Sequence, residues 1–152
     1  MSSISSTNNN SISDLPNETD FIALTEQLLE FSARTHAKAS MLFITFDSKV
    51  EEINTAQNDL ALDAISNRLL SKARESDIYA HLGGMNFANL SIETSEQHAS
   101  ILVEKLKNEL AEPIVLSDGS LIKLNAKIGA AQFPTQGENY QALVDYAKNN
   151  IV

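Results

Sequence analysis

The residue types that most often carry out chemistry are sparse in this 152-residue chain and do not cluster along it. The three histidines, His36, His81 and His98, fall on different expected elements, and their spacing matches no metal-ligand set. The chain has no cysteine, which excludes disulfides, thiolate zinc sites and cysteine nucleophiles. It also lacks a Walker-type phosphate loop and a serine nucleophile elbow. These patterns predict neither a histidine or cysteine metal centre nor a serine hydrolase.

Two polar features do have the spacing of a site. Arg74 and Asp77 lie three residues apart, and the glycine pair Gly83-Gly84 follows nine residues after Arg74. Two glycines between short apolar segments predict a tight hairpin, because glycine adopts a positive φ without steric cost. Arg74 and Asp77 taken alone also fit a solvated i,i+3 pair at the C-terminal end of a helix, where arginine suits the helix dipole.

The elements expected to position these residues begin with helices. Phe21, Leu24, Leu28 and Phe31 recur at helical spacing and predict an amphipathic helix that reaches about residue 36. The same kind of spacing predicts three further helices, over Asp59–Ala73, over Ser95–Leu110, and from Tyr140 onward.

Apolar and β-branched runs predict the strands. Met41–Phe46 is continuous and apolar, as in a buried central strand. Further strands are expected at Ile78–Leu82 and Phe87–Ile92, on either side of the glycine pair, and a second hairpin of Ile114–Leu116 with Leu121–Phe133 is expected across Asp118-Gly119. Helices and antiparallel hairpins in this order predict an α+β fold with an antiparallel-rich central sheet flanked by helices.

Composition sets the remaining limits. Residues 1–13 are almost entirely polar and predict a disordered tail, with one domain over residues 14–152. The net charge of −9 disfavours binding to nucleic acid or to an anionic membrane. No signal peptide is recognisable, and no apolar run approaches the roughly 20 residues of a membrane helix. We therefore expect a soluble, cytoplasmic protein.

Six anchors, in order and spacing, resemble the bacterial GGDEF (diguanylate cyclase) family. They are Leu15-Pro16-Asn17, Phe43-Ile44-Thr45-Phe46-Asp47, Ile53-Asn54, Asp63, Leu82-Gly83-Gly84-Met85-Asn86-Phe87, and Lys127-Ile128-Gly129-Ala130-Ala131 followed by Phe133-Pro134. The resemblance covers the chain from about residue 14 to its end. It implies a palm-like fold of the nucleotidyl cyclase or ferredoxin-like kind, with the sequence expected to be truncated at the C-terminus before the family's triphosphate-binding Lys and Arg and its closing strand.

The resemblance also implies where catalysis should reside and what this chain has there. The family joins two GTP molecules with Mg²⁺ held by carboxylates of the first strand and of the signature turn, and Thr45 and Met85 stand at those positions. A hydroxyl and a thioether are poor ligands for a hard cation. Asn86 replaces the family's glutamate, and Asp47 aligns with the acid that does not bind metal. The expectation is a degenerate domain without catalytic residues, metal or cofactor, with Mg²⁺ relevant only to residual activity.

Since catalysis is not expected, the function that the resemblance still implies is ligand binding. In the family an Arg-x-x-Asp at the position of Arg74 and Asp77 forms the product-inhibition site for cyclic di-GMP, and Lys105 falls near its second basic residue. Asn54 and Asp63 align with the two residues that read guanine in the GTP pocket. The segment between Asp47 and Asn54 is one residue longer than the family pattern, so a helix cap and a surface acid are the alternative interpretations.

Three hypotheses follow. The first is an inactive GGDEF-like signalling domain that binds cyclic di-GMP through Arg74 and Asp77 and passes the signal to an unidentified protein partner. The second is an interaction or scaffold module in which every nucleotide site is a relic. The third is a diguanylate cyclase with residual, GTP-dependent activity.

Overall fold

The computed structural model describes residues 15–47, 55–71, 73, 77–92, 97–119, 121–123 and 125–151, and for residues 47 and 55–58 it describes the backbone alone. The predicted tail over residues 1–13, and the candidate residues Arg74 and Asn54, lie outside these ranges.

A four-stranded antiparallel sheet forms the centre of the molecule. Its strands, in the order β3-β4-β2-β7, are β3 (Asp77–Gly83), β4 (Asn86–Ile92), β2 (Ala39–Asp47) and β7 (Asn125–Phe133). β2 pairs with β4 on one side and with β7 on the other, and β3 pairs with β4 at the edge. The predicted central strand and first hairpin are therefore confirmed.

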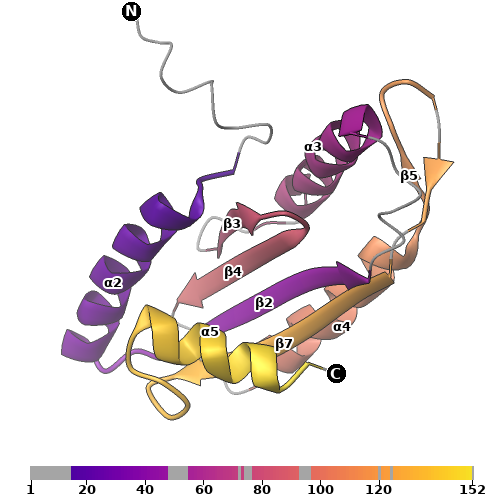
Figure 1. The fold of residues 1–152 in the computed structure, drawn as a ribbon. Coiled ribbons are helices and arrows are strands. Elements are labelled where there is room, and N and C mark those ends of the chain that lie inside the picture. The colour runs from indigo at the N-terminus through magenta and orange to yellow at the C-terminus, as the bar shows by residue number, and fades with distance from the viewer. Residues whose placement is uncertain are drawn as a thin grey trace, which may run out of the picture.

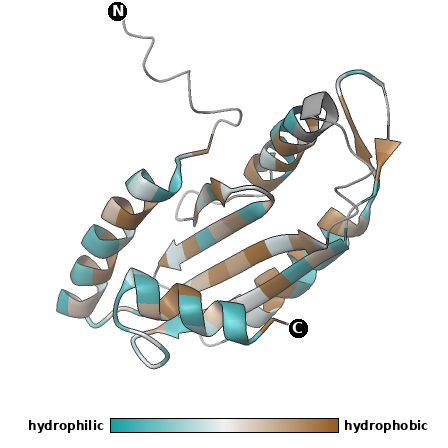
Figure 2. Ribbon diagram, in the orientation of Figure 1, coloured by the Kyte–Doolittle hydropathy of each residue, from teal (hydrophilic) through white to brown (hydrophobic). Residues whose placement is uncertain are grey.

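Helices cover both faces of this sheet (Figure 1). α3 (Thr55–Ser71) and α4 (His98–Ala111) pack on one face, and α2 (Glu18–Arg34) and α5 (Tyr140–Asn149) pack on the other. Successive residues of β2 alternate between the two cores, with Leu42 and Ile44 toward α3 and α4 and Met41 and Phe43 toward α2 and α5. Because both faces are covered, the middle of β2, Met41–Ile44, is continuously apolar, and much of the strand is coloured as hydrophobic in Figure 2.

The buried face of α2 differs from the predicted one. The helix buries Phe21, Thr25, Leu29 and Ser32, whereas Leu24 and Phe31 are 39% and 45% exposed. The apolar residues chosen by hydrophobic spacing lie partly on the side of the helix and not wholly on its buried face. The small side chains of Thr25 and Ser32 are buried instead. The prediction of a helix was right, and the prediction of its core face was wrong for Leu24 and Phe31.

The second predicted hairpin is shorter than expected. β5 (Ile114–Val115) pairs only with β6 (Leu121–Ile122), in a separate two-stranded sheet. β7 starts at Asn125 and pairs with β2. The prediction of one strand over Leu121–Phe133 was wrong, because its two ends pair with different partners and the chain changes sheets after Ile122. Helix limits also shift, since α3 begins at Thr55 rather than at Asp59.

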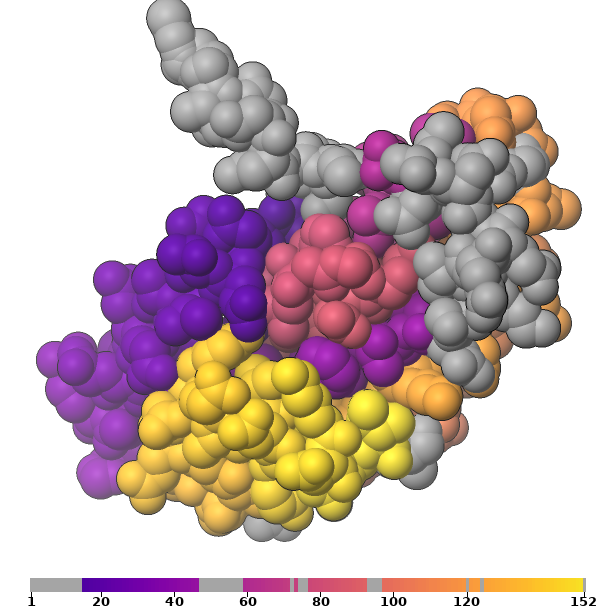
Figure 3. Space-filling view, viewed as in Figure 1, coloured from indigo at the N-terminus to yellow at the C-terminus, as the bar shows by residue number. Residues whose placement is uncertain are grey.

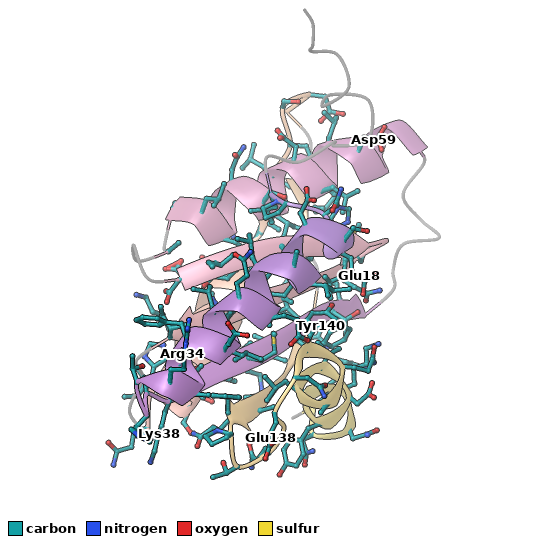
Figure 4. The ribbon with its side chains drawn as sticks, turned by 90° about the vertical axis from the view of Figure 1, so that its left-hand side faces the viewer. Glu18, Arg34, Lys38, Asp59, Glu138 and Tyr140 are labelled. Carbon is teal, nitrogen blue, oxygen red and sulfur yellow. The ribbon has the colours of Figure 1, made fainter. Side chains whose placement is uncertain are left out.

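Tyr140, the first residue of α5, joins α5 to α2. Its hydroxyl donates to Oε2 of Glu18 at 3.2 Å, its backbone N–H donates to Oε2 of Glu26 at 3.0 Å, and its ring meets Phe21 edge-on at 5.8 Å. Glu18 and Tyr140 lie side by side between the two helices (Figure 4). Burial raises the pKa of the Tyr140 phenol well above its usual value, and the negative charge of Glu18 and the hydrogen bond to it raise that pKa further.

This raised pKa predicts a loss of stability in alkali. The unfolded chain releases the Tyr140 proton near pH 10 whereas the folded chain keeps it, so the free energy of unfolding falls as pH rises above about 10, by at most about 1.4 kcal/mol per pH unit. Tyr140→Phe should remove this pH-dependent contribution to the free energy of unfolding, because phenylalanine has no proton to release. Urea unfolding at pH 8 to 11.5 should show the stability advantage of wild type over Tyr140→Phe shrinking above pH 10. A constant difference across that range would contradict the prediction.

Candidate functional site

The glycine turn is the best-defined part of the candidate site. Gly83 ends β3 with a φ of 104°, Gly84 follows with a φ of 56°, and Gly83 pairs with Asn86 at the start of β4. His81 Nε2 lies 2.8 Å from the carbonyl oxygen of Gly84, and the tautomer protonated at Nε2 donates to it. The ring of His81 stacks on that of the fully buried Phe87 at 4.9 Å. Through these two contacts, His81 on β3 bonds to the turn and packs on the first residues of β4. The β3–β4 hairpin reaches the surface beside α2 (Figure 3).

Two of the sequence-predicted residues meet at this turn. Thr45 and Asn86 are opposite each other in the β2–β4 register, and Thr45 Oγ1 donates to Asn86 Oδ1 at 2.8 Å. Met85 is only 9% exposed and belongs to the core cluster that contains Phe46 and Phe87. The three positions for which the resemblance implies acidic side chains therefore hold a neutral hydrogen-bonded pair and a buried thioether.

Two basic residues lie near this pair on the described strands and helices. Lys127 is opposite Thr45 in the β2–β7 register and is exposed, and Lys148 Nζ lies over the Phe43 ring at 5.2 Å from its centre. Among the described residues, no group of three or more histidine, aspartate or glutamate side chains is arranged to hold a metal ion. The side chain of Asp47 lies outside the described atoms.

Asp77 occupies the first position of β3 and is half-buried. The hydroxyl of Ser91, its neighbour across the β3–β4 pair, lies 2.8 Å from Asp77 Oδ1 and donates to it. The same hydroxyl lies 3.2 Å from Oδ1 of Asn89, which is fully buried. Asp77 is thus oriented by the adjacent strand, whereas Arg74, its predicted partner, lies outside the described residues.

The remaining candidates lie on helices. Lys105 is exposed on α4, and Asp63 is exposed on α3, where it lines a groove of about 410 Å³ together with Asn67, Arg68 and Ser117. The guanidinium of Arg68 donates to the carbonyl oxygens of Glu109, Glu112 and Pro113 at 3.1 to 3.3 Å, at the end of α4. The structure places Asp63 in this groove, and Asn54, the other predicted guanine-binding residue, lies outside the described residues.

Sequence reasoning missed two of these residues. Ser91 gave no signal, because its partner Asp77 is 14 residues away and the pairing depends on strand register. Arg68 had a weak signal, since a basic residue in the last turn of a helix often binds carbonyl oxygens of that helix, but Arg68 binds carbonyl oxygens in the last turn of α4 and just after it.

Known proteins resemble this chain along nearly its whole length. The model of the family described as diguanylate cyclase, GGDEF domain, matches residues 8–152. The chain is 31% identical over 142 residues to the cyclic di-GMP phosphodiesterase NbdA and 32% identical over 139 residues to the diguanylate cyclase TpbB, both of Pseudomonas aeruginosa. These alignments cover 90% and 88% of this chain, but only 18% and 32% of the two longer proteins.

The fold agrees with solved structures. The GGDEF domain of TpbB from Pseudomonas aeruginosa superposes with a TM-score of 0.83 at 30% identity, covering 90% of this chain and 87% of that domain. The predicted α+β architecture is confirmed. No helix among the described residues is long and apolar enough to cross a membrane.

Proposed function

The chain belongs to the GGDEF family of diguanylate cyclase domains, and from this premise we propose that it is a degenerate, catalytically inactive signalling domain that binds cyclic di-GMP. The observation that carries the proposal is the hydrogen bond from Thr45 to Asn86. It joins Thr45, at one of the two positions where the family holds divalent metal with a carboxylate, to Asn86, at the position of the family's signature glutamate. The buried position of Met85 supports the same conclusion.

Without carboxylates to hold Mg²⁺, the domain would lose a large contribution to transition-state stabilisation, which favours an inactive domain. Phosphoryl transfer between two triphosphates depends on neutralising charge that develops in the transition state, and bound Mg²⁺ supplies much of that neutralisation. Thr45 and Asn86 provide neutral oxygens that already share one hydrogen bond, and the thioether of Met85 is both soft and buried. We therefore propose that GTP is not converted to cyclic di-GMP.

The orientation of Asp77 supports the binding part of the proposal. A carboxylate that reads the N–H groups of a guanine base must be held in one rotamer, and the Ser91 hydroxyl bonds to one of its oxygens. Arg74 would then bind a phosphate or a guanine edge bidentately, and Lys105 on α4 would contribute a second positive charge. Transmission of this state to a protein partner completes the proposed signalling role.

Calorimetry with purified protein tests both parts. We expect wild type to bind cyclic di-GMP, and Arg74→Ala and Asp77→Asn each to weaken the affinity by roughly 10- to 100-fold, as for the loss of charged hydrogen bonds. Arg34→Ala is the control, because Arg34 forms an exposed i,i+4 pair with Glu30 on α2 and should leave the affinity unchanged.

Two results would contradict the proposal. Cyclic di-GMP formed from GTP with Mg²⁺ or Mn²⁺ would establish residual cyclase activity. The absence of binding at tens of micromolar ligand, together with an unchanged thermal midpoint in the presence of guanine nucleotides, would favour a pure interaction module.

A further inference from the structure

We propose that a groove beside α2, on the face of the molecule shown in Figure 4, binds a small amphipathic cation, a ligand with an apolar body and an ammonium or guanidinium group. The groove, called the α2 groove below, has a volume of about 680 Å³, within the range of small-molecule sites. It is lined by the C-terminal half of α2, by the segment that leads into β2, and by the end of β7 with the loop that follows. Its lining includes Leu29, Ser32, Ala33, Phe133, Pro134 and Glu138.

Two facing parts of the α2 groove are apolar. Leu29 and Ala33 come from α2, and Phe133 and Pro134 come from the end of β7 and the loop after it, so the two walls are about 100 residues apart in sequence. The chain turns sharply where α2 ends, since His36 has a φ of 58° and the N–H of Ala37 donates to the carbonyl oxygen of Ser32 at 2.8 Å. These surfaces suit an aliphatic or aromatic ligand body.

A buried hydroxyl gives the groove a specific polar contact. Ser32 has no solvent exposure, lines the groove, and its Oγ has no hydrogen-bond partner among the described residues. A buried polar atom without a partner is costly, and most such atoms in proteins are satisfied. A ligand N–H group would donate to this oxygen once the groups that shield it from solvent move aside.

The charges around the groove select a cation. Three carboxylates line it, those of Glu26, Glu30 and Glu138, against the basic side chains Lys38 and His36. Glu26 already accepts the backbone N–H of Tyr140, and Glu30 pairs loosely with Arg34 at 3.7 Å. Glu138 and Lys38 lie at the same end of this face (Figure 4). With Glu30 paired to Arg34, the carboxylates of Glu26 and Glu138 still outnumber the ammonium group of Lys38, and this excess favours a positively charged ligand over a neutral or anionic one of the same shape.

Occupation of the α2 groove would also stabilise the contact between α2 and the β7–α5 segment. The ligand would touch both walls, next to the hydrogen bond from Tyr140 to Glu26 that already joins them. Because binding to the folded state alone stabilises it, a ligand here would hold α2 against α5. The described lining of this site includes neither Asp77 nor the glycine turn, nor the predicted ligand-binding residue Arg74, so the proposal does not depend on the proposed function.

Matched probes test the charge preference. We would titrate the full chain with 2-phenylethylamine, 2-phenylethanol and 3-phenylpropanoate, which share an apolar body, and follow backbone amide NMR shifts. The amine should give saturable shifts confined to residues 26–38 and 133–138, and the alcohol and carboxylate should bind at least several-fold more weakly. Equal shifts for all three probes, or shifts spread over the surface, would overturn the proposal.

Variants separate binding from folding. Glu30→Gln and Glu138→Gln should each weaken amine binding by roughly threefold, the size expected of solvent-exposed ion pairs, whereas Glu104→Gln, which lies in another groove beside β7, should not. Ser32→Ala should weaken amine binding without lowering the thermal midpoint, because its hydroxyl has no partner in the described fold. Unchanged amine affinity in Ser32→Ala and in both glutamate variants would refute the site.

Discussion

Gly129→Ala should destabilise the protein by about 3 kcal/mol or more, at the upper end for overpacking substitutions. Gly129 lies on β7 opposite Phe43, where α5 crosses the sheet. A Cβ atom there would overlap the carbonyl oxygen of Ala147, which is backbone of α5 and cannot rotate away, and would lie 2.8 Å from its carbonyl carbon. The helix would have to move off the sheet, and the buried contacts of Leu143 and Val144 would be disturbed with it.

Urea unfolding followed by circular dichroism measures this effect, with Gly119→Ala as the matched control. Gly119 has a φ of 89° and open space around an added Cβ, so its substitution should cost only the strain of a left-handed residue, about 1 to 2 kcal/mol. Equal losses in the two variants would show that the close approach of α5 to β7 does not account for the cost.

Phe87→Ala should destabilise the protein by about 3 to 5 kcal/mol, as for other fully buried aromatic side chains. Phe87 follows the glycine turn and has no solvent exposure. Its ring meets Phe46 edge-on at 6.1 Å and stacks with His81 at 4.9 Å, so truncation removes packing on both sides and leaves a cavity next to the turn. For a domain whose total stability is about 5 to 15 kcal/mol, this is a large fraction.

Phe31→Ala is the control for that experiment, because the same atoms are removed from a side chain that is 45% exposed on α2. We expect a loss of less than about 1 kcal/mol. If the two phenylalanine variants unfolded at the same urea concentration, the assignment of Phe87 to the core and of Phe31 to the surface would be wrong. The comparison also tests the face of α2 that hydrophobic spacing misassigned.

Phe87→Ala tests the structural role of the signature turn, Gly83-Gly84-Met85-Asn86-Phe87, and leaves its charge unchanged. Phe87 and the glycines determine the geometry of the hairpin, whereas Met85 and Asn86 determine its charge. A domain that keeps the geometry of this hairpin but lacks its acidic side chains would retain the fold. It would also retain any binding site placed on the same hairpin. That is the situation proposed for Asp77, which the hairpin partner Ser91 orients.

Local patterns were enough to predict most elements. The apolar run at Met41–Phe46 and the glycine pair at residues 83–84 correspond to the observed β2 and to the β3–β4 turn, because strand and turn preferences depend on residues close in sequence. Element limits and partners were less accurate, as at Leu121–Phe133, where the strand pattern continues although the pairing partner changes from β5 to β2.

The sequence by itself determined the α+β architecture, the family resemblance, and the absence of acidic side chains at Thr45 and Met85, because these depend on residue identity and on patterns a few residues long. Only the tertiary structure decided which face of α2 is buried, that Thr45 bonds to Asn86, and that Ser91 orients Asp77. It alone brought Ser32 and Phe133 to one groove. Such contacts join residues far apart in sequence, and they follow from strand register and from how closely helices pack on the sheet, neither of which local residue preferences specify.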